Sequence, residues 1–161
     1  MIAYAGCLME DFYRPQIEVE SEAARIAEQK LMEIWEGLDS VFLGWRITLK
    51  NDIHTLAAEC SYEDWDGEGG FPITYSAVKA AERFIDLLPD SILLPYISPE
   101  NTGEILFNWS LGKNITLNVI ISMDFAIYAG IFGEERINGM TRVLDEMPSV
   151  IRTILLRYFR K

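Results

Sequence analysis

Three consecutive runs between residues 103 and 132 place apolar side chains at every second position. Successive side chains of a β-strand point to opposite faces, so a period of two predicts strands with one buried face. Short turns at 111–113 and 123–124 separate the runs, which is typical of an antiparallel meander. The sequence therefore predicts a three-stranded antiparallel meander over about 103–132. We expect these side chains on its buried face: Ile105, Phe107, Trp109, Leu117, Val119, Phe125 and Ile127.

The apolar period changes to that of an amphipathic helix in three other segments. Gly37 and Pro89 predict the ends of the first two helices, because glycine has a low helix propensity and proline cannot continue a helix. Thr74 is a suitable N-cap for the second helix. The three predicted helices cover about 18–36, 74–88 and 148–160, and they would bring Phe84, Ile85 and Ile154 against the sheet.

The rest of the chain gives weaker signals. Residues 41–49 are apolar but contain Gly44, so the pattern leaves their structure undecided, and 53–60 favours a short helix. Three segments are expected to be connections: 1–16 as an irregular lead-in, 91–102 as an ordered loop and 133–138 as a polar turn. Together these predictions give a single α+β domain over 1–161, with helices laid on one face of the sheet.

The composition is that of a folded, acidic protein. The 161 residues are 50% hydrophobic and carry a net charge of −11, with a pI near 4.5. A chain of this size can bury about 70% of the surface of its unfolded state. Binding to phosphates requires clustered lysine and arginine, so the charge argues against direct nucleic-acid binding and favours a basic protein partner.

Cysteine usage points to a reducing compartment. Cys7 and Cys60 have no CxxC spacing, and the residues before Cys7 are too few and uncharged to form a secretion signal. No apolar run reaches the 18 or so residues that span a bilayer. We therefore expect reduced thiols, no membrane association and a cytoplasmic location.

The segment 62–72 combines four acids, three glycines, Trp65 and Pro72 just before a helix. Glycine adopts backbone conformations that other residues avoid, and proline fixes φ, so this segment is expected to be a shaped loop. Trp65 is expected to turn inward and anchor it.

The acids of this loop and the histidine that precedes it suggest two kinds of chemistry. Acids at 63–70 could bind a hard cation, but the third acid and the spaced glutamate of an EF-hand loop are missing. His54, the only histidine, lies six and seven residues before Cys60 and Ser61, yet no activating motif accompanies it. We expect no catalytic residue, no metal and no cofactor, and the question of enzyme activity stays open, with a non-enzymatic protein favoured.

Part of the chain resembles a known group. Trp65-Asp66-Gly67-Glu68-Gly69 with Pro72, the strand 103–109 and Met147-Pro148 are similar to motifs of small uncharacterised bacterial proteins. That group carries W-D-G-x-G-A-x-P before a helix and then a G-x-I-x-L-E-W strand. The resemblance covers about 59–159 and implies the fold, but no activity is established for the group. Gly70 stands where the group has Ala, and Asn108 where it has Glu, so a functional carboxylate at the second position would be absent here.

The charge distribution carries the functional hypothesis. Residues 10–39 hold nine acids and three bases, residues 59–70 hold five acids and no base, and the last ten residues carry four unopposed bases. This asymmetry favours a small, acidic protein-interaction module that covers a basic partner, such as an antitoxin, an immunity protein or a phage-type inhibitor of a nucleic-acid-acting or defence protein. Its alternatives are a metal-dependent module or enzyme centred on 63–70, and a self-assembling structural domain; a homodimer is possible in either case. The expected partner-binding residues are Glu63, Asp64, Asp66, Glu68, Glu20, Glu22, Glu28 and Glu33.

Overall fold

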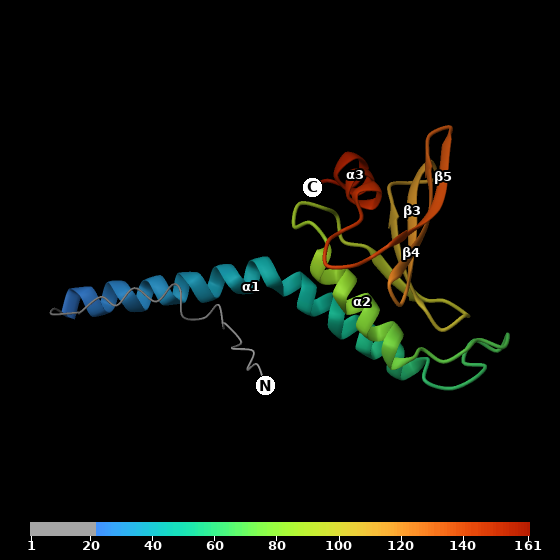
Figure 1. The fold of residues 1–161 in the computed structure, drawn as a ribbon. Coiled ribbons are helices and arrows are strands. Elements are labelled where there is room, and N and C mark those ends of the chain that lie inside the picture. Colours follow the sequence, from blue (N-terminus) through green and yellow to red (C-terminus); the bar gives the residue numbers. More distant parts are fainter. Residues whose placement is uncertain (1–21) are drawn as a thin grey trace, which may run out of the picture. The chain divides into compact units, whose positions relative to one another are not determined.

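The computed structural model describes residues 22–161 and divides into two compact units, Met1–Ser40 and Val41–Lys161. The second unit contains the sheet and the core, and all packing described below lies within it. Over residues 22–161, three helices and five strands give an α+β fold, as predicted (Figure 1). In chain order they are α1 (Glu22–Glu59), α2 (Tyr75–Leu87), β1 (Tyr96–Pro99), β2 (Ile105–Ser110), β3 (Ile115–Ser122), β4 (Phe125–Phe132), β5 (Glu135–Arg142) and α3 (Ser149–Tyr158).

The sheet has five antiparallel strands in the order β1-β2-β3-β4-β5, so the prediction of a three-stranded meander is wrong. Strand β1 lies in the segment expected to be a loop, and β5 begins inside the segment expected to be a polar turn. Both are edge strands, and edge positions are only partly buried, so they need no apolar alternation. The sequence of β5 consequently lacks the period that revealed β2 to β4.

Strand β4 buries the opposite set of side chains from the one predicted. The turn 123–124 has only two residues, so Ile121 of β3 lies directly opposite Ala126 of β4. Opposite residues of an antiparallel pair share a face, and Ala126 is therefore buried beside Ile121. Ile127 is 45% exposed and Phe125 is partly buried. The expectation that Phe125 and Ile127 belong to the core is wrong.

Helix α1 continues far beyond its predicted end. It passes through Gly37, through 41–49 and through the short helix expected over 53–60, so the predicted stop at Gly37 is wrong. One glycine inside a helix costs about 1 kcal/mol. Burial of Leu49 and Ile53, four residues apart on one helix face, offsets that cost with ~1.5–3 kcal/mol for each side chain. The N-terminal end of the predicted helix and the lead-in 1–16 lie outside the described residues.

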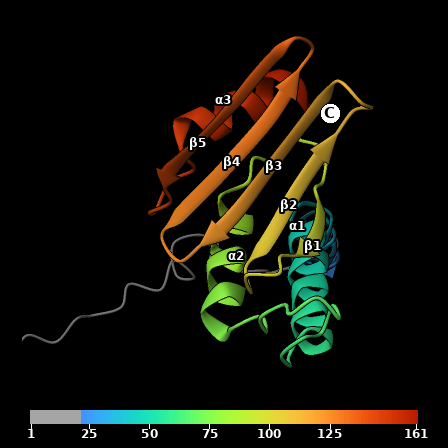
Figure 2. The same cartoon turned by 90° about the vertical axis from the view of Figure 1, so that its right-hand side faces the viewer.

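Helices α2 and α3 match their predictions to within two residues at each end. Thr74 is the N-cap of α2, and its Oγ1 accepts a hydrogen bond from the backbone N–H of Ala77 at 3.2 Å. Helix α2 ends at Leu87, shortly before Pro89. Figure 2 shows α2, α3 and the last turns of α1 on one side of the sheet, which confirms that helices cover a single face.

An aromatic cluster fills the space between this face and the helices. The rings of Phe84 and Phe107 meet edge to face at 5.0 Å between centroids, and Trp109 lies 6.4 Å beyond Phe107. Trp109 is almost fully buried, and its indole N–H donates to the carbonyl of Leu93 at 2.9 Å. The predicted core residues that are buried are Phe84, Ile85, Ile105, Phe107, Trp109, Leu117, Val119 and Ile154.

The other face of the sheet carries no helix in the part of the chain that the structure describes (Figure 2). Asn108 lies on this face and donates through Nδ2 to Asn118 Oδ1 at 2.6 Å. Beside this pair, one residue from each of four neighbouring strands forms an apolar row, Leu106, Ile120, Ile127 and Met140. None of the helices between residues 22 and 161 has the apolar length that crossing a bilayer requires.

Candidate interaction site at the acidic loop

The acidic segment forms a closed loop between α1 and α2. Ile73 donates through its backbone N–H to the carbonyl of Cys60 at 3.0 Å, so the two ends of the loop lie side by side. A loop of this length with adjacent ends has the form of an Ω-loop. Three of its residues, Asp64, Gly67 and Gly69, have φ between 60° and 90°, which explains why glycine is dense here. The expectation of a shaped connection is confirmed.

Two loop carboxylates bind backbone groups of the loop itself. Asp66 Oδ1 accepts from the N–H of Glu68 at 2.9 Å and from the N–H of Gly70 at 2.8 Å. Asp64 Oδ1 accepts from the N–H of Gly69 at 2.7 Å. Aspartate side chains commonly stabilise turns in this way. These two acids therefore hold the loop in shape as well as carrying charge.

The electrostatics of Asp66 follow from this geometry. The N–H of Glu68, and next the N–H of Gly70, stabilise the carboxylate and lower the pKa of Asp66 below its usual range. An added β-carbon on Gly70 would lie 2.7 Å from Asp66 Oδ2, although the φ of Gly70 is not in the left-handed region. Gly70 is needed because the carboxylate approaches its backbone so closely.

Trp65 anchors the loop. Its side chain is half-buried against the hydrophobic core, and its indole N–H donates to the carbonyl of Phe71 at 2.9 Å. The N–H of Phe71 in turn donates to the carbonyl of Asn101, in the turn between β1 and β2, at 2.8 Å. The loop is thus fixed both to itself and to the sheet, and the inward orientation expected for Trp65 is confirmed.

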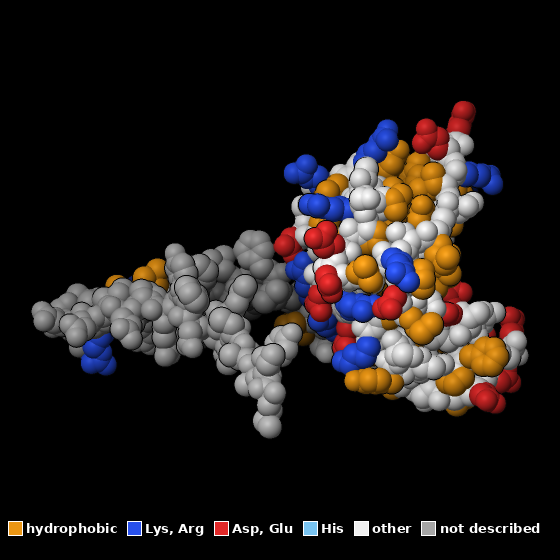
Figure 3. Space-filling model, viewed as in Figure 1, with side chains coloured by type: hydrophobic (Ala, Val, Ile, Leu, Met, Phe, Trp, Pro, Cys, Tyr) orange, Lys and Arg blue, Asp and Glu red, His pale blue; other side chains and the backbone are white. Residues whose placement is uncertain are grey.

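The outer surface of the loop combines negative charge with aromatic rings. Glu63 and Glu68 are exposed, and none of the ion pairs within residues 22–161 involves either side chain. Tyr62, Phe71 and Tyr75 are 59%, 63% and 76% exposed. Figure 3 shows red and orange side chains together over this loop, at the lower right. The sequence analysis did not single out these three rings, because nothing in the local pattern shows which aromatic side chains of the segment stay exposed.

The structure brings together only half of the predicted partner-binding residues. Glu63, Asp64, Asp66 and Glu68 lie on one loop of the second unit. Glu20 lies outside the described residues. Glu22, Glu28 and Glu33 lie on α1 in the first unit, where the structure describes the backbone of the helix but not these side chains. The candidate site is therefore the loop alone.

His54 takes part in a surface ion-pair cluster. Its Nε2 lies 2.8 Å from Glu82 Oε1 on α2, and Lys79 Nζ lies 2.7 Å from the other oxygen of Glu82. The bond to Lys79 is the main reason that the pKa of Glu82 is lowered, with a smaller contribution from His54. Cys60 is a buried free thiol, and burial raises its pKa, which disfavours the nucleophilic thiolate.

Metal binding has no geometric support in this region. Within residues 22–161, no three His, Cys, Asp or Glu side chains lie close enough together to hold an ion. Asp64 and Asp66, the acids best placed in the loop, direct oxygens at backbone N–H groups instead. Comparisons of the chain with family models, curated proteins and solved structures found no match.

Proposed function

We propose that the protein is a cytoplasmic, non-enzymatic interaction module that binds a basic surface of a partner protein through the loop 62–75. A partner whose basic surface acts on nucleic acid, or belongs to a defence system, would be neutralised when the loop covers that surface. In such a role the protein would act as an antitoxin, an immunity protein or a phage-type inhibitor.

One observation carries this proposal: four acids and two exposed rings lie on a loop that is already fixed by its own hydrogen bonds, and a third exposed ring, Tyr75, begins α2 beside it. Binding costs less when the interacting loop is ordered beforehand, because less conformational entropy is lost. Here Asp64 and Asp66 supply that order, while Glu63 and Glu68 remain available to a partner.

The two kinds of side chain have different expected roles. Aromatic residues supply much of the binding energy in protein interfaces, and Tyr62, Phe71 and Tyr75 are the candidates here. Acidic residues act mainly on the association rate, by steering a basic partner, and they select against acidic competitors. The segment 59–70 holds no base, so the negative field of the loop is not offset within it.

The test is a comparison of matched charge reversals. Glu63→Lys/Glu68→Lys leaves the hydrogen bonds of Asp64 and Asp66 in place, and Asp145→Lys/Glu146→Lys makes the same change of net charge at exposed acids elsewhere. The wild-type protein is used to capture partners from the native host, and the captured proteins are purified. Their association rates are then measured against all three proteins at low and high salt.

We expect the loop variant to associate several-fold more slowly than the wild type at low salt. We also expect added salt to slow association of the wild type, because the Debye length falls from ~30 Å at 0.01 M to ~10 Å at 0.1 M. The control variant should behave as the wild type. A second pair, Phe71→Ala and, as its control at an exposed ring outside the loop, Tyr96→Ala, separates the ring contribution. A partner that binds both charge variants equally at every salt concentration would contradict the proposal.

A further inference from the structure

Strand β5 forms a long edge of the sheet. All eight of its residues pair in continuous register with β4, and no segment within residues 22–161 pairs with its other side. An edge strand presents unpaired N–H and C=O groups, and proteins usually protect such an edge with proline, lysine, a bulge or a covering segment. Strand β5 contains no proline and no lysine, its register has no bulge, and its charged residues, Glu135, Arg136 and Arg142, lie at its two ends and leave the middle of the edge uncharged.

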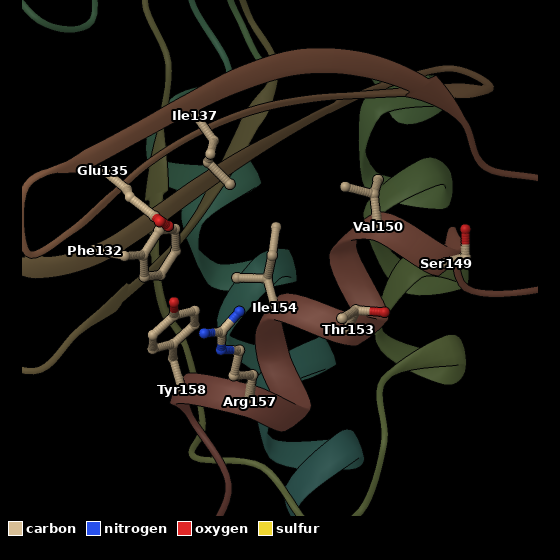
Figure 4. Close-up of a pocket in the computed structure, with 9 residues that line it drawn as sticks. All are labelled: Phe132, Glu135, Ile137, Ser149, Val150, Thr153, Ile154, Arg157 and Tyr158. Carbon is tan, nitrogen blue, oxygen red and sulfur yellow. The ribbon is translucent and has the colours of Figure 1, made fainter.

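An apolar groove of about 380 Å³ runs beside this edge, between β5 and α3 (Figure 4). Figure 4 shows Ile137 of β5 and Ile154 of α3 pointing toward each other, with Val150 next to them on α3. Phe132 and Tyr158 stack at 4.3 Å between centroids and close one end. A strand added to β5 would lie about 4.8 Å beyond it. Alternate side chains of that strand would then point toward α3 and enter this groove.

The charges around the edge and the groove are positive, against the trend of the chain. Residues 135–161 hold six bases and three acids, whereas the whole chain carries −11. Arg136 and Arg142 lie at the two ends of β5, and Arg157 lines the groove beside Tyr158. None of the ion pairs within residues 22–161 involves these three arginines. Glu135 is the only acid that lines the groove.

We propose that β5 binds an extended segment of a partner protein as a sixth strand, and that this segment alternates apolar and acidic side chains. The unpaired backbone of an edge selects an extended conformation, and a pocket beside it selects alternate side chains, which is how strand addition obtains affinity and specificity. The apolar side chains enter the groove at Ile137 and Ile154, and the acidic ones point to the open face of the sheet, where Arg136 and Arg142 lie. This surface is separate from the acidic loop and opposite to it in charge.

The first experiment uses a fluorescein-labelled, eight-residue peptide of alternating valine and glutamate, with fluorescence anisotropy as the readout. We expect saturable binding with a Kd below about 1 mM, and no binding of the valine–lysine peptide. Two further peptides carry N-methyl groups on the odd or on the even residues. Because alternate N–H groups of a strand point to opposite edges, only one of these two peptides should bind.

Amide hydrogen exchange places the peptide on the molecule. The amides of β5 on the side away from β4 should become protected when the valine–glutamate peptide binds, and those of the loop 62–75 should not change. The variant Glu63→Lys/Glu68→Lys, which tests the proposed function, should leave peptide affinity unchanged or raise it slightly. The two proposals can therefore fail independently.

Variants of α3 test the groove itself. Thr153→Trp fills the groove and should abolish peptide binding, whereas Thr55→Trp makes the same change at an exposed position of α1 and should not. Arg157→Glu should weaken binding several-fold, and Arg152→Glu, on the same helix but outside the groove, should weaken it less. Thermal unfolding of each variant confirms that it folds, and any variant that does not fold is replaced by Thr153→Phe or Arg157→Gln.

Three results would overturn this proposal. The first is the absence of saturable binding by the valine–glutamate peptide, and the second is equal binding by both N-methylated peptides. The third is a dimer of the protein alone, seen by sedimentation, that Thr153→Trp dissociates. In that case a second copy of the chain occupies the edge.

Discussion

The carboxylate of Asp66 occupies the space that a side chain on Gly70 would need. Asp66 Oδ1 accepts the N–H of Gly70 at 2.8 Å, and Asp66 Oδ2 lies 2.7 Å from the position of an added β-carbon. The hydrogen bond and the lack of a side chain are therefore two parts of one requirement.

Gly70→Ala should weaken the loop, because the new methyl group displaces the Asp66 carboxylate from its two N–H donors. We expect a lower thermal midpoint and faster amide exchange at Glu68. Gly44→Ala is the matched control: it lies inside α1 with open space around it, and it should stabilise the protein by about 0.5–1 kcal/mol. Equal shifts in the same direction for both variants would count against the role assigned to Asp66.

The loop should loosen in acid. The pKa of Asp66 is lowered by backbone N–H donors, so the folded state binds this proton less readily than the unfolded state. The resulting stabilisation is complete above the ordinary carboxyl range and is lost as the pH falls through the lowered folded-state pKa. The difference in thermal midpoint between the wild type and Asp66→Asn should therefore be constant near neutral pH and shrink in acid. A difference that grows in acid would contradict this assignment.

One pair of substitutions tests which side chains of β4 face the core. Phe132 of β4 is buried, so Phe132→Ala should cost about 3–5 kcal/mol. Ile127 lies on the open face, and Ile127→Ala should cost less than about 1 kcal/mol. Chemical denaturation measures both values. A larger loss of stability for Ile127→Ala than for the other substitution would show that β4 buries Ile127 and exposes the alternate side chains.

Met123 has a φ of 49°, which is unfavourable for a residue with a side chain. Met123→Gly should remove this strain and stabilise the protein by up to about 1 kcal/mol, after the entropy of the more flexible unfolded chain is subtracted. The carbonyl of Met123, which accepts from Arg83 at 3.0 Å, is retained. Lys113→Gly, in the preceding turn, is the control and should destabilise, since its φ is not positive. A lower midpoint for Met123→Gly would count against strain at this turn.

Trp65→Ala should destabilise the protein by about 2 kcal/mol, less than the ~3–5 kcal/mol typical of a fully buried tryptophan, because Trp65 is only partly buried. Trp65→Phe keeps much of the packing but loses the hydrogen bond to the carbonyl of Phe71, so its stability should be intermediate. If Trp65→Ala keeps wild-type stability and loses partner binding, the residue belongs to the contact surface instead.

Much of the second unit could be predicted from the sequence because its helices and central strands have one apolar face. Thr74 and Pro89 predicted the limits of α2, and alternation predicted β2 and β3. The side chains that β4 buries could also have been predicted. A turn of two residues places odd-numbered residues of one strand opposite even-numbered residues of the next. Strand β5 could not be predicted from the sequence, because an exposed edge strand does not need apolar side chains at alternate positions.

The candidate site was predicted in part. The position of the loop and the inward side chain of Trp65 followed from composition. Composition did not show which acids bind the backbone. The choice between Asp64 and Glu63 depends on the local φ values of the folded loop. The exposure of the Phe71 and Tyr75 rings could not be predicted either, since only the folded structure shows which apolar side chains lie outside the core.

The strand order carries a kinetic consequence. Each strand pairs only with its neighbours in sequence, and the turns between strands contain two to five residues. Pairing each strand with the next one costs little conformational entropy, because the cost of closing a loop grows with its length. Topologies dominated by such local pairings fold faster than sheets of similar size with distant pairings. The sheet can therefore assemble hairpin by hairpin, and the docking of the last turns of α1 and of α2 waits for more distant parts of the chain.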